Sequence, residues 1–210
     1  HIISPEFAEK SDGRAVIISE DESVCVMIGE EDHIRLQLSV PGFAREKAYD
    51  RANSIDDLLS NKCGFAYDDQ LGYLTECPTN LGTGLRASVM LHLPALSALG
   101  YIKSIVSLMN KIGLTVRGIY GEGSDARANM YQLSNQVTLG ISEEDTISKL
   151  KSAVMQIVER EREMRKKLLE NNSGEIYDKL WRSFGTLKYA RSIDTIEASK
   201  LISNVRLAQV

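Results

Sequence analysis

Residues 72–93 constrain the fold most strongly, because a glycine-rich loop runs directly into an alternating strand pattern. The loop follows Cys77, contains two glycines and ends at Arg86. In the residues after it, apolar and polar side chains alternate, which predicts a strand with one buried and one exposed face. The apolar face comprises Val89, Leu91 and Leu93, and the opposite face comprises Met90 and His92.

The loop itself has two interpretations. Glycines let backbone amides come close to a ligand, and an arginine offers five donors to phosphate oxygens, so the loop is a candidate anion site. A plain turn before a strand is the alternative. A P-loop is excluded, because no Gly-Lys-Ser/Thr follows and the glycines lead into a strand instead of a helix.

The composition narrows the class of protein. The chain has 210 residues, of which 43% are hydrophobic and 26% charged, as in ordinary globular proteins. Its net charge of -4 disfavours a nucleic-acid partner. No apolar stretch reaches membrane-spanning length and no signal-peptide pattern is present, so we expect no membrane association. The three cysteines lack CxxC spacing, which indicates reduced thiols in the cytoplasm and neither a disulfide framework nor a zinc site.

Hydrophobic periodicity predicts an α+β protein, with an antiparallel or mixed β-sheet flanked by helices and a helical segment at the end. The predicted strands are residues 15–18, 24–28, 34–40, 65–67, 73–75, 89–93, 114–120, 130–133 and 136–139. The predicted helices are residues 43–61, a single helix from Pro94 to a cap at Gly113, a helix from the N-cap Ser142 to 170, residues 176–189, and a helix capped by Asp194. We expect residues 1–170 to form one domain and residues 171–210 to begin a second, helical one.

Three motifs follow one another in a fixed order: GEEDHIR at 29–35, CPTNLGTGLR at 77–86 and RGIYGEG at 117–123. In this order they resemble the ATP:guanido phosphotransferases, the family of creatine and arginine kinases, whose motifs are N-E-E-D-H-L-R, C-P-[TS]-N-L-G-T-x-x-R and an R-G loop. Gly29 stands where that family has asparagine. The resemblance covers roughly residues 1–165. It implies the phosphagen-kinase catalytic domain, which is glutamine-synthetase-like.

The loop GIYGEGS and the run RASVMLHLP are most similar to bacterial members of this family that phosphorylate arginine side chains of proteins. The resemblance implies an ATP-dependent transferase, a kinase that uses Mg²⁺, with a role in bacterial stress response. The implied partners are protein substrates bearing arginine, a zinc-binding activator protein, and Clp protease and heat-shock repressor targets. A homodimer is a further implied state.

The chemistry explains why the family needs these residue types. A guanidinium stays protonated at neutral pH, so its phosphorylation requires removal of a proton and alignment of one nitrogen. The resemblance implies that Glu31 is the base, that Glu122 is the second carboxylate of the clamp, and that Cys77, as a thiolate, adds negative charge. It implies that Glu30 reaches Mg²⁺ through water. The implied ATP contacts are His1, Arg35, Arg86, Ala87, Ser88, Val89, Met90, Arg117, Gly118, Ile119, Tyr120 and Gly121.

One family motif is absent from the sequence. The upstream S-x-R-x-R pattern, which supplies further phosphate-binding arginines, does not occur, and the chain starts at His1 without a methionine. We therefore expect an N-terminal portion to be missing. One consequence would be that these 210 residues alone lack kinase activity. Two alternatives stay open: a phosphagen kinase that acts on free arginine or a small guanidine, and a kinase-derived interaction module that does not catalyse.

Overall fold

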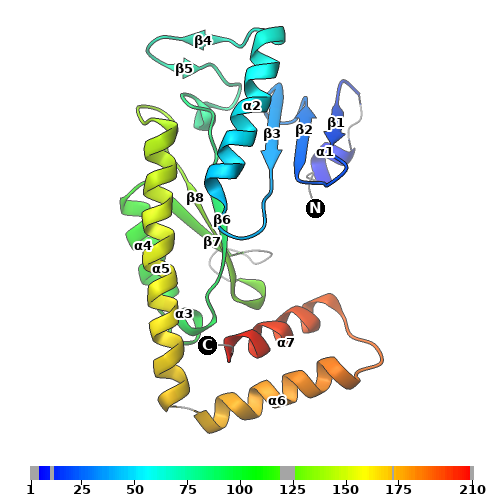
Figure 1. Ribbon diagram of the computed structural model, residues 1–210, viewed down its shortest axis with the longest axis vertical. Helices are drawn as coiled ribbons and strands as arrows, with labels where there is room; N and C mark the ends of the chain where they lie inside the picture. Colours follow the sequence, from blue (N-terminus) through cyan, green and yellow to red (C-terminus); the bar gives the residue numbers. More distant parts are fainter. Residues whose placement is uncertain (1–4, 10–11, 119–125, 172, 209–210) are drawn as a thin grey trace. The chain divides into compact units, whose positions relative to one another are not determined.

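Figure 1 shows the computed structural model, which describes residues 5–9, 12–118, 126–171 and 173–208. The chain divides into two compact units. The first comprises residues 1–85 with 138–143, and the second comprises residues 86–137 with 144–210.

The first unit is built on a three-stranded antiparallel sheet in the order β1-β2-β3. Its strands are β1 (Ala15–Ile18), β2 (Val24–Ile28) and β3 (Ile34–Leu38). Cys25 and Met27 of β2 form a small buried cluster with Phe7 of helix α1 (Pro5–Glu9). Arg35 of β3, a predicted phosphate-binding residue, pairs with Met27 in the ladder and therefore lies on the same face of the sheet as this cluster.

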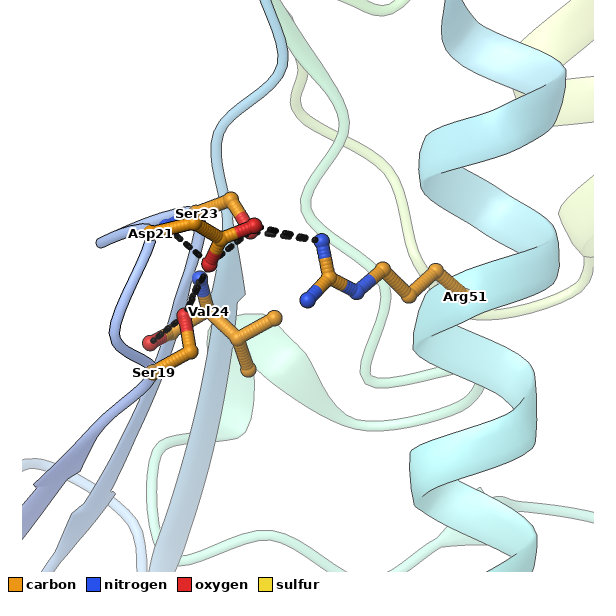
Figure 2. Close-up of polar contacts among 5 residues, drawn as sticks. All are labelled: Ser19, Asp21, Ser23, Val24 and Arg51. Atoms are coloured by element: carbon orange, nitrogen blue, oxygen red, sulfur yellow. Dashed lines mark hydrogen bonds and ion pairs between the residues drawn. The ribbon is translucent and has the colours of Figure 1, made fainter.

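Helix α2 (Arg45–Cys63) is attached to the turn between β1 and β2 (Figure 2). In that turn, the Asp21 carboxylate accepts hydrogen bonds from the hydroxyls of Ser19 and Ser23. Arg51 of α2 donates to Ser23 Oγ at 2.6 Å and lies 3.3 Å from Asp21 Oδ2. The Ser19 hydroxyl, followed by Ser23 and Arg51, holds the pKa of Asp21 well below its usual range. The turn and the helix are therefore joined by a carboxylate that stays ionised.

The remainder of the first unit is a short hairpin and the loop behind it. The hairpin joins β4 (Tyr67–Asp68) and β5 (Gly72–Tyr73), and the loop contains the 3₁₀ turn η1 (Pro78–Asn80). The predicted hairpin is confirmed, although its strands lie closer to the turn than the expected residues 65–67 and 73–75.

The second unit contains another three-stranded antiparallel sheet, in the order β6-β8-β7. Its strands are β6 (Ser88–His92), β7 (Leu114–Gly118) and β8 (Met130–Asn135). The predicted alternation is confirmed, because Leu91 and Leu93 are buried while Met90 is 58% exposed. The buried face packs with the helices into the main core of the molecule.

Five helices accompany this sheet among the described residues. They are α3 (Pro94–Ala98), α4 (Ile102–Lys111), the long α5 (Glu143–Asn171), α6 (Ser173–Tyr189) and α7 (Thr195–Leu207). The N-cap at Asp194 is confirmed, since its carboxylate accepts from the amides of Ile196 and Glu197. The C-cap of α4 is Ile112, and the predicted cap Gly113 is the next residue, with a φ of 76° and its amide donating to Asn110 O.

Two element predictions are wrong. The single helix from Pro94 to Gly113 is two helices, because the chain leaves the helix at Gly100, whose φ of 75° is a left-handed conformation that glycine adopts readily. The pair of short strands 130–133 and 136–139 is one strand, β8. Ser134 and Asn135 continue its ladder instead of forming a turn.

The predicted α+β class is confirmed: helices flank antiparallel strands. Within the described ranges, the strands form three separate sheets, the third being the β4–β5 pair. None of the described helices has the length and apolar character needed to cross a membrane.

Candidate active site

The acidic turn between β2 and β3 presents one carboxylate to solvent and uses the other two in contacts. The side chain of Glu31 is exposed. Glu30 is 13% exposed, lies 3.2 Å from Arg35 Nη1, and accepts the Glu31 amide at 2.8 Å. Burial opposes ionisation of Glu30, but the Glu31 amide and Arg35, with Arg14, outweigh it and lower the pKa of Glu30. Glu30 therefore stays anionic beside a predicted phosphate-binding arginine.

Asp32 ties this turn to the loop that carries Cys77. Its Oδ1 accepts the backbone amide of Cys77 at 3.0 Å, and its Oδ2 accepts Asn80 Nδ2 at 2.7 Å. The turn with the predicted base and the loop with the predicted thiol are thus fixed to each other within the first unit. The sequence gives no sign of this role beyond the place of Asp32 between Glu31 and His33.

Cys77 lies at the start of η1 and is partly exposed. Its Sγ is 3.1 Å from Thr79 Oγ1, and its carbonyl oxygen accepts the Thr75 hydroxyl at 2.7 Å. With its amide bound to Asp32, the backbone of Cys77 is held at both polar groups. A thiol whose backbone is fixed in this way has a defined position, as a contact to a substrate would require.

Of the two glycines of the loop, Gly82 is closely packed, whereas a Cβ on Gly84 would have nothing within 4 Å. Gly82 donates to Tyr73 O and Gly84 donates to Asn80 O, so both amides bond inside the unit. A Cβ on Gly82 would come within 2.2 Å of the Thr138 carbonyl oxygen. Thr138, which is 4% exposed, also donates its hydroxyl to Thr79 O and Leu81 O. These contacts favour the interpretation of the loop as a packed turn over an anion site formed by these two amides.

In the second unit, the exposed face of the sheet carries three of the predicted nucleotide contacts: Ser88, Met90 and Arg117. Met90 and Arg117 both pair with Gln132 of β8, so Met90, Gln132 and Arg117 form one row across β6, β8 and β7. Ala87 and Val89 belong to the other face, where they pack against the core. Gly118 pairs with the buried Tyr131.

Asn135 fixes the backbone where the loop enters β6. It is 3% exposed, and its Oδ1 accepts the Ala87 amide at 2.8 Å. The backbone amide of Asn135 donates to Ala87 O at 3.2 Å, and its side-chain Nδ2 donates to Val137 O at 3.1 Å. Arg86, which is exposed, directly precedes Ala87, whose backbone these bonds hold. The position of Asn135 at the end of a strand, and not in a turn, is what makes these bonds available.

Five predicted site residues lie outside the described ranges: His1, Ile119, Tyr120, Gly121 and Glu122. In the described part of the chain, no three His, Cys, Asp or Glu side chains are grouped so that they could hold a metal ion. The proposed contact of Glu30 with Mg²⁺ through water therefore stays a prediction.

Two family models match the chain. Residues 1–164 match the model described as ATP:guanido phosphotransferase, C-terminal catalytic domain. Residues 173–209 match the model described as Protein-arginine kinase McsB C-terminal domain. The predicted domain division at residue 170 stays a prediction.

Curated relatives and solved structures agree with these matches. The protein-arginine kinase of Halalkalibacterium halodurans is 51% identical over 207 residues, which are 99% of this chain and 58% of that protein. The protein-arginine kinase of Brevibacillus brevis has the same identity and coverage. The chain thus spans 58% of the length of these relatives.

Among solved structures, the duplicated taurocyamine kinase of Schistosoma mansoni with bound transition-state-analogue components has a TM-score of 0.65 and 36% identity, covering 80% of this chain and 22% of that one. Lombricine kinase has a TM-score of 0.64 and 27% identity, covering 87% of this chain and 44% of that one.

Proposed function

Since the chain belongs to the ATP:guanido phosphotransferase family, we propose that it is part of a protein-arginine kinase, which transfers the γ-phosphate of ATP to arginine side chains of proteins. The observation that carries this proposal is the presence of both matches in one chain, the catalytic domain and the C-terminal domain of protein-arginine kinases. The chain spans 58% of the length of these relatives, so the activity of the whole protein is part of the proposal.

In the proposed reaction, a guanidinium nitrogen of the substrate attacks the γ-phosphorus. A nitrogen–phosphorus bond forms, the bond from the γ-phosphorus to the bridging oxygen of ADP breaks, and the nitrogen gives its proton to Glu31. Glu122 is the second carboxylate that holds the guanidinium plane, since a carboxylate binds two N–H groups side by side. The exposed side chain of Glu31, on a turn that Asp32 joins to the Cys77 loop, supports this assignment.

The nucleotide enters as its magnesium complex and is bound as a substrate. We assign its phosphate oxygens to the three arginines Arg35, Arg86 and Arg117, because phosphoryl transfer spreads negative charge over these oxygens. The exposed positions of all three support the assignment. We assign further nucleotide contacts to His1, to residues 87–90 and to residues 118–121, and we assign Glu30 a water-mediated contact with Mg²⁺.

Alignment is the larger part of the proposed catalysis. Holding two reactants in place lowers the activation barrier by up to about 7–11 kcal/mol. A general base accelerates the reaction roughly 10²–10⁴-fold, which corresponds to only about 3–5 kcal/mol. Residues that fix the backbone near the site therefore matter as much as those that touch the substrate. Asp32 in the first unit and Asn135 in the second are the residues of this kind.

A second candidate function is transfer to a small guanidine, which the similarity to taurocyamine and lombricine kinases favours. The test compares the full-length protein on an arginine-rich protein and on free arginine or taurocyamine, each with MgATP. The proposal expects a kcat/KM for protein arginine that exceeds that for the small guanidines. A preference for the small guanidines would support the second candidate, and failure to bind MgATP in calorimetry would support an interaction module without catalysis.

The remaining expectations follow from the same proposal. An ATP-dependent kinase with protein substrates acts where ATP is available, so we place it in the cytoplasm. The roles in stress response and Clp-type degradation, the zinc-binding activator and the homodimer stay predictions.

A further inference from the structure

A buried hydroxyl group on α7 contacts two polar side chains of the second unit. Ser203 is 3% exposed, and its Oγ accepts a hydrogen bond from Asn129 Nδ2 at 2.8 Å. The same oxygen lies 2.9 Å from His92 Nε2. Asn129 ends the 3₁₀ turn η2 (Arg127–Asn129), which packs against α7, and His92 ends β6. One small side chain therefore links α7 to both elements.

The donors around His92 define its tautomer. Arg165 of α5 places Nη2 3.3 Å from His92 Nδ1, and a guanidinium can only donate. Nδ1 is therefore the acceptor, and Nε2 carries the proton and donates to Ser203 Oγ. Burial, followed by Arg165 and Arg206, lowers the pKa of His92, in agreement with a neutral ring. Ser203 thus accepts two hydrogen bonds.

Both partners of Ser203 lie at one end of the β6–β8 ladder. His92 pairs with Met130, and the Leu93 amide donates to Asn129 O at 2.9 Å. Ala128 and Asn129 have φ values of 55° and 57°, a left-handed conformation that is unfavourable for alanine and tolerated better by asparagine. A backbone in this conformation persists only where its surroundings hold it, and the bond from Asn129 to Ser203 is such a contact.

The link continues into α5 and α3 through ionised groups. Arg165 also donates to His92 O at 3.3 Å and to Arg206 O at 3.4 Å, and its Nε donates to Glu161 Oε1 at 2.7 Å. The carboxylate of Glu161, which is buried, accepts the amides of Ala95 and Leu96 at the start of α3. The contacts of Ser203 are therefore part of a hydrogen-bonded network in which each charge has a partner.

We propose that Ser203 is a positioning residue, through which α7 fixes the end of the β6–β8 ladder and the backbone of η2. The inference rests on the proposed function, because β6 carries the assigned nucleotide contacts Ser88 and Met90, and η2 follows the residues that include Glu122. It goes beyond that function because α7 lies in the residues that match the C-terminal domain model, whereas β6 and η2, which it would support, lie in the residues that match the catalytic domain model. Ser203 touches no substrate in this account and acts through Asn129 and His92.

The test measures amide hydrogen exchange in residues 126–134 of the full-length protein for two matched variants. Ser203→Ala removes the acceptor of both hydrogen bonds. Ser199→Ala is the control on the same helix, because that hydroxyl donates only within α7, to Thr195 O. We expect exchange in 126–134 to be about tenfold faster in Ser203→Ala and unchanged in Ser199→Ala. We expect kcat for arginine phosphorylation to fall about tenfold in the same variant.

A second variant keeps the test decisive if Ser203→Ala does not fold. Asn129→Gly removes the side-chain donor but tolerates the left-handed backbone, so it isolates the bond to Ser203. We expect faster exchange than in the wild type, and no increase in the double variant beyond that of Ser203→Ala, which already lacks both bonds. Equal exchange in Ser203→Ala, Asn129→Gly and the Ser199→Ala control would overturn the inference. Lack of arginine phosphorylation by the wild type would refute the proposed function instead, and the exchange measurement would still decide the role of Ser203.

Discussion

Replacing Asp32 by asparagine tests how the predicted base and thiol are held together. The carboxylate accepts two N–H donors, from Cys77 at 3.0 Å and from Asn80 at 2.7 Å. An asparagine has one oxygen, so its amide nitrogen would face one of these donors and leave that donor without a partner. A hydrogen bond to a charged group contributes about 1.5–3 kcal/mol. Because Asp32 is only partly buried and solvent weakens the interaction, we expect Asp32→Asn to lower the free energy of unfolding by about 1.5 kcal/mol, the lower end of this range.

The kinetic effect follows from the same geometry. The contact fixes the turn of Glu31 to the Cys77 loop, so its loss should lower kcat by about 10–100-fold, as a loss of 1.4 kcal/mol in transition-state stabilisation lowers a rate about tenfold. The assays are urea denaturation and arginine phosphorylation by the full-length protein. Asp69→Asn, an exposed acid between β4 and β5, is the matched control and should change neither quantity. An Asp32→Asn variant with wild-type stability and wild-type kcat would refute the reasoning.

Three further predictions concern other contacts. Glu122→Gln should abolish phosphoryl transfer while leaving the melting temperature unchanged, and retained transfer in a radiolabel assay would contradict its role. Gly82→Ala should destabilise the protein by more than about 2 kcal/mol, because its Cβ would meet the Thr138 carbonyl oxygen, whereas Gly84→Ala has nothing within 4 Å and should cost only about 1–2 kcal/mol for its left-handed backbone; equal losses in denaturation curves would count against the packing argument. Burial, with Arg165 and Arg206, lowers the pKa of His92 from 6.5 to about 4. Between these two pH values the unfolded state binds a proton that the folded state does not, so the free energy of unfolding should fall as the pH decreases from 6.5 to about 4. In urea titrations His92→Gln should show a smaller fall over that window than the wild type, and identical slopes would exclude the histidine as a cause.

Local patterns predicted much of the fold. The alternation of residues 89–93 predicts the buried face of β6, and the N-cap residue Asp194 predicts the start of α7. These predictions succeed because the signals lie within a few residues of the structure that they determine. The break at Gly100 was missed because the apolar stripe of α3 continues into α4, and periodicity alone does not locate a change of helix axis.

The candidate site shows a different limit. Its motifs identify the residue types, and the exposure of Glu31, Arg35 and Arg117 agrees with roles at a surface. The contacts that hold the site come from distant positions: Asp32 bonds to Cys77 across 45 residues, and Asn135 bonds to Ala87 across 48. Short stretches of sequence contain no signal for such distant pairs, so the sequence places Asn135 between two predicted strands and indicates no role for Asp32.

The most direct test of the proposed function is mass spectrometry of an arginine-rich protein after incubation with the full-length protein and MgATP. We predict phosphorylation on arginine side chains, with loss of at least about 10²-fold in rate for Glu31→Gln, because that variant lacks the carboxylate proposed to accept the proton. Phosphorylation only on serine, threonine or tyrosine, or a Glu31→Gln variant as active as the wild type, would contradict the account.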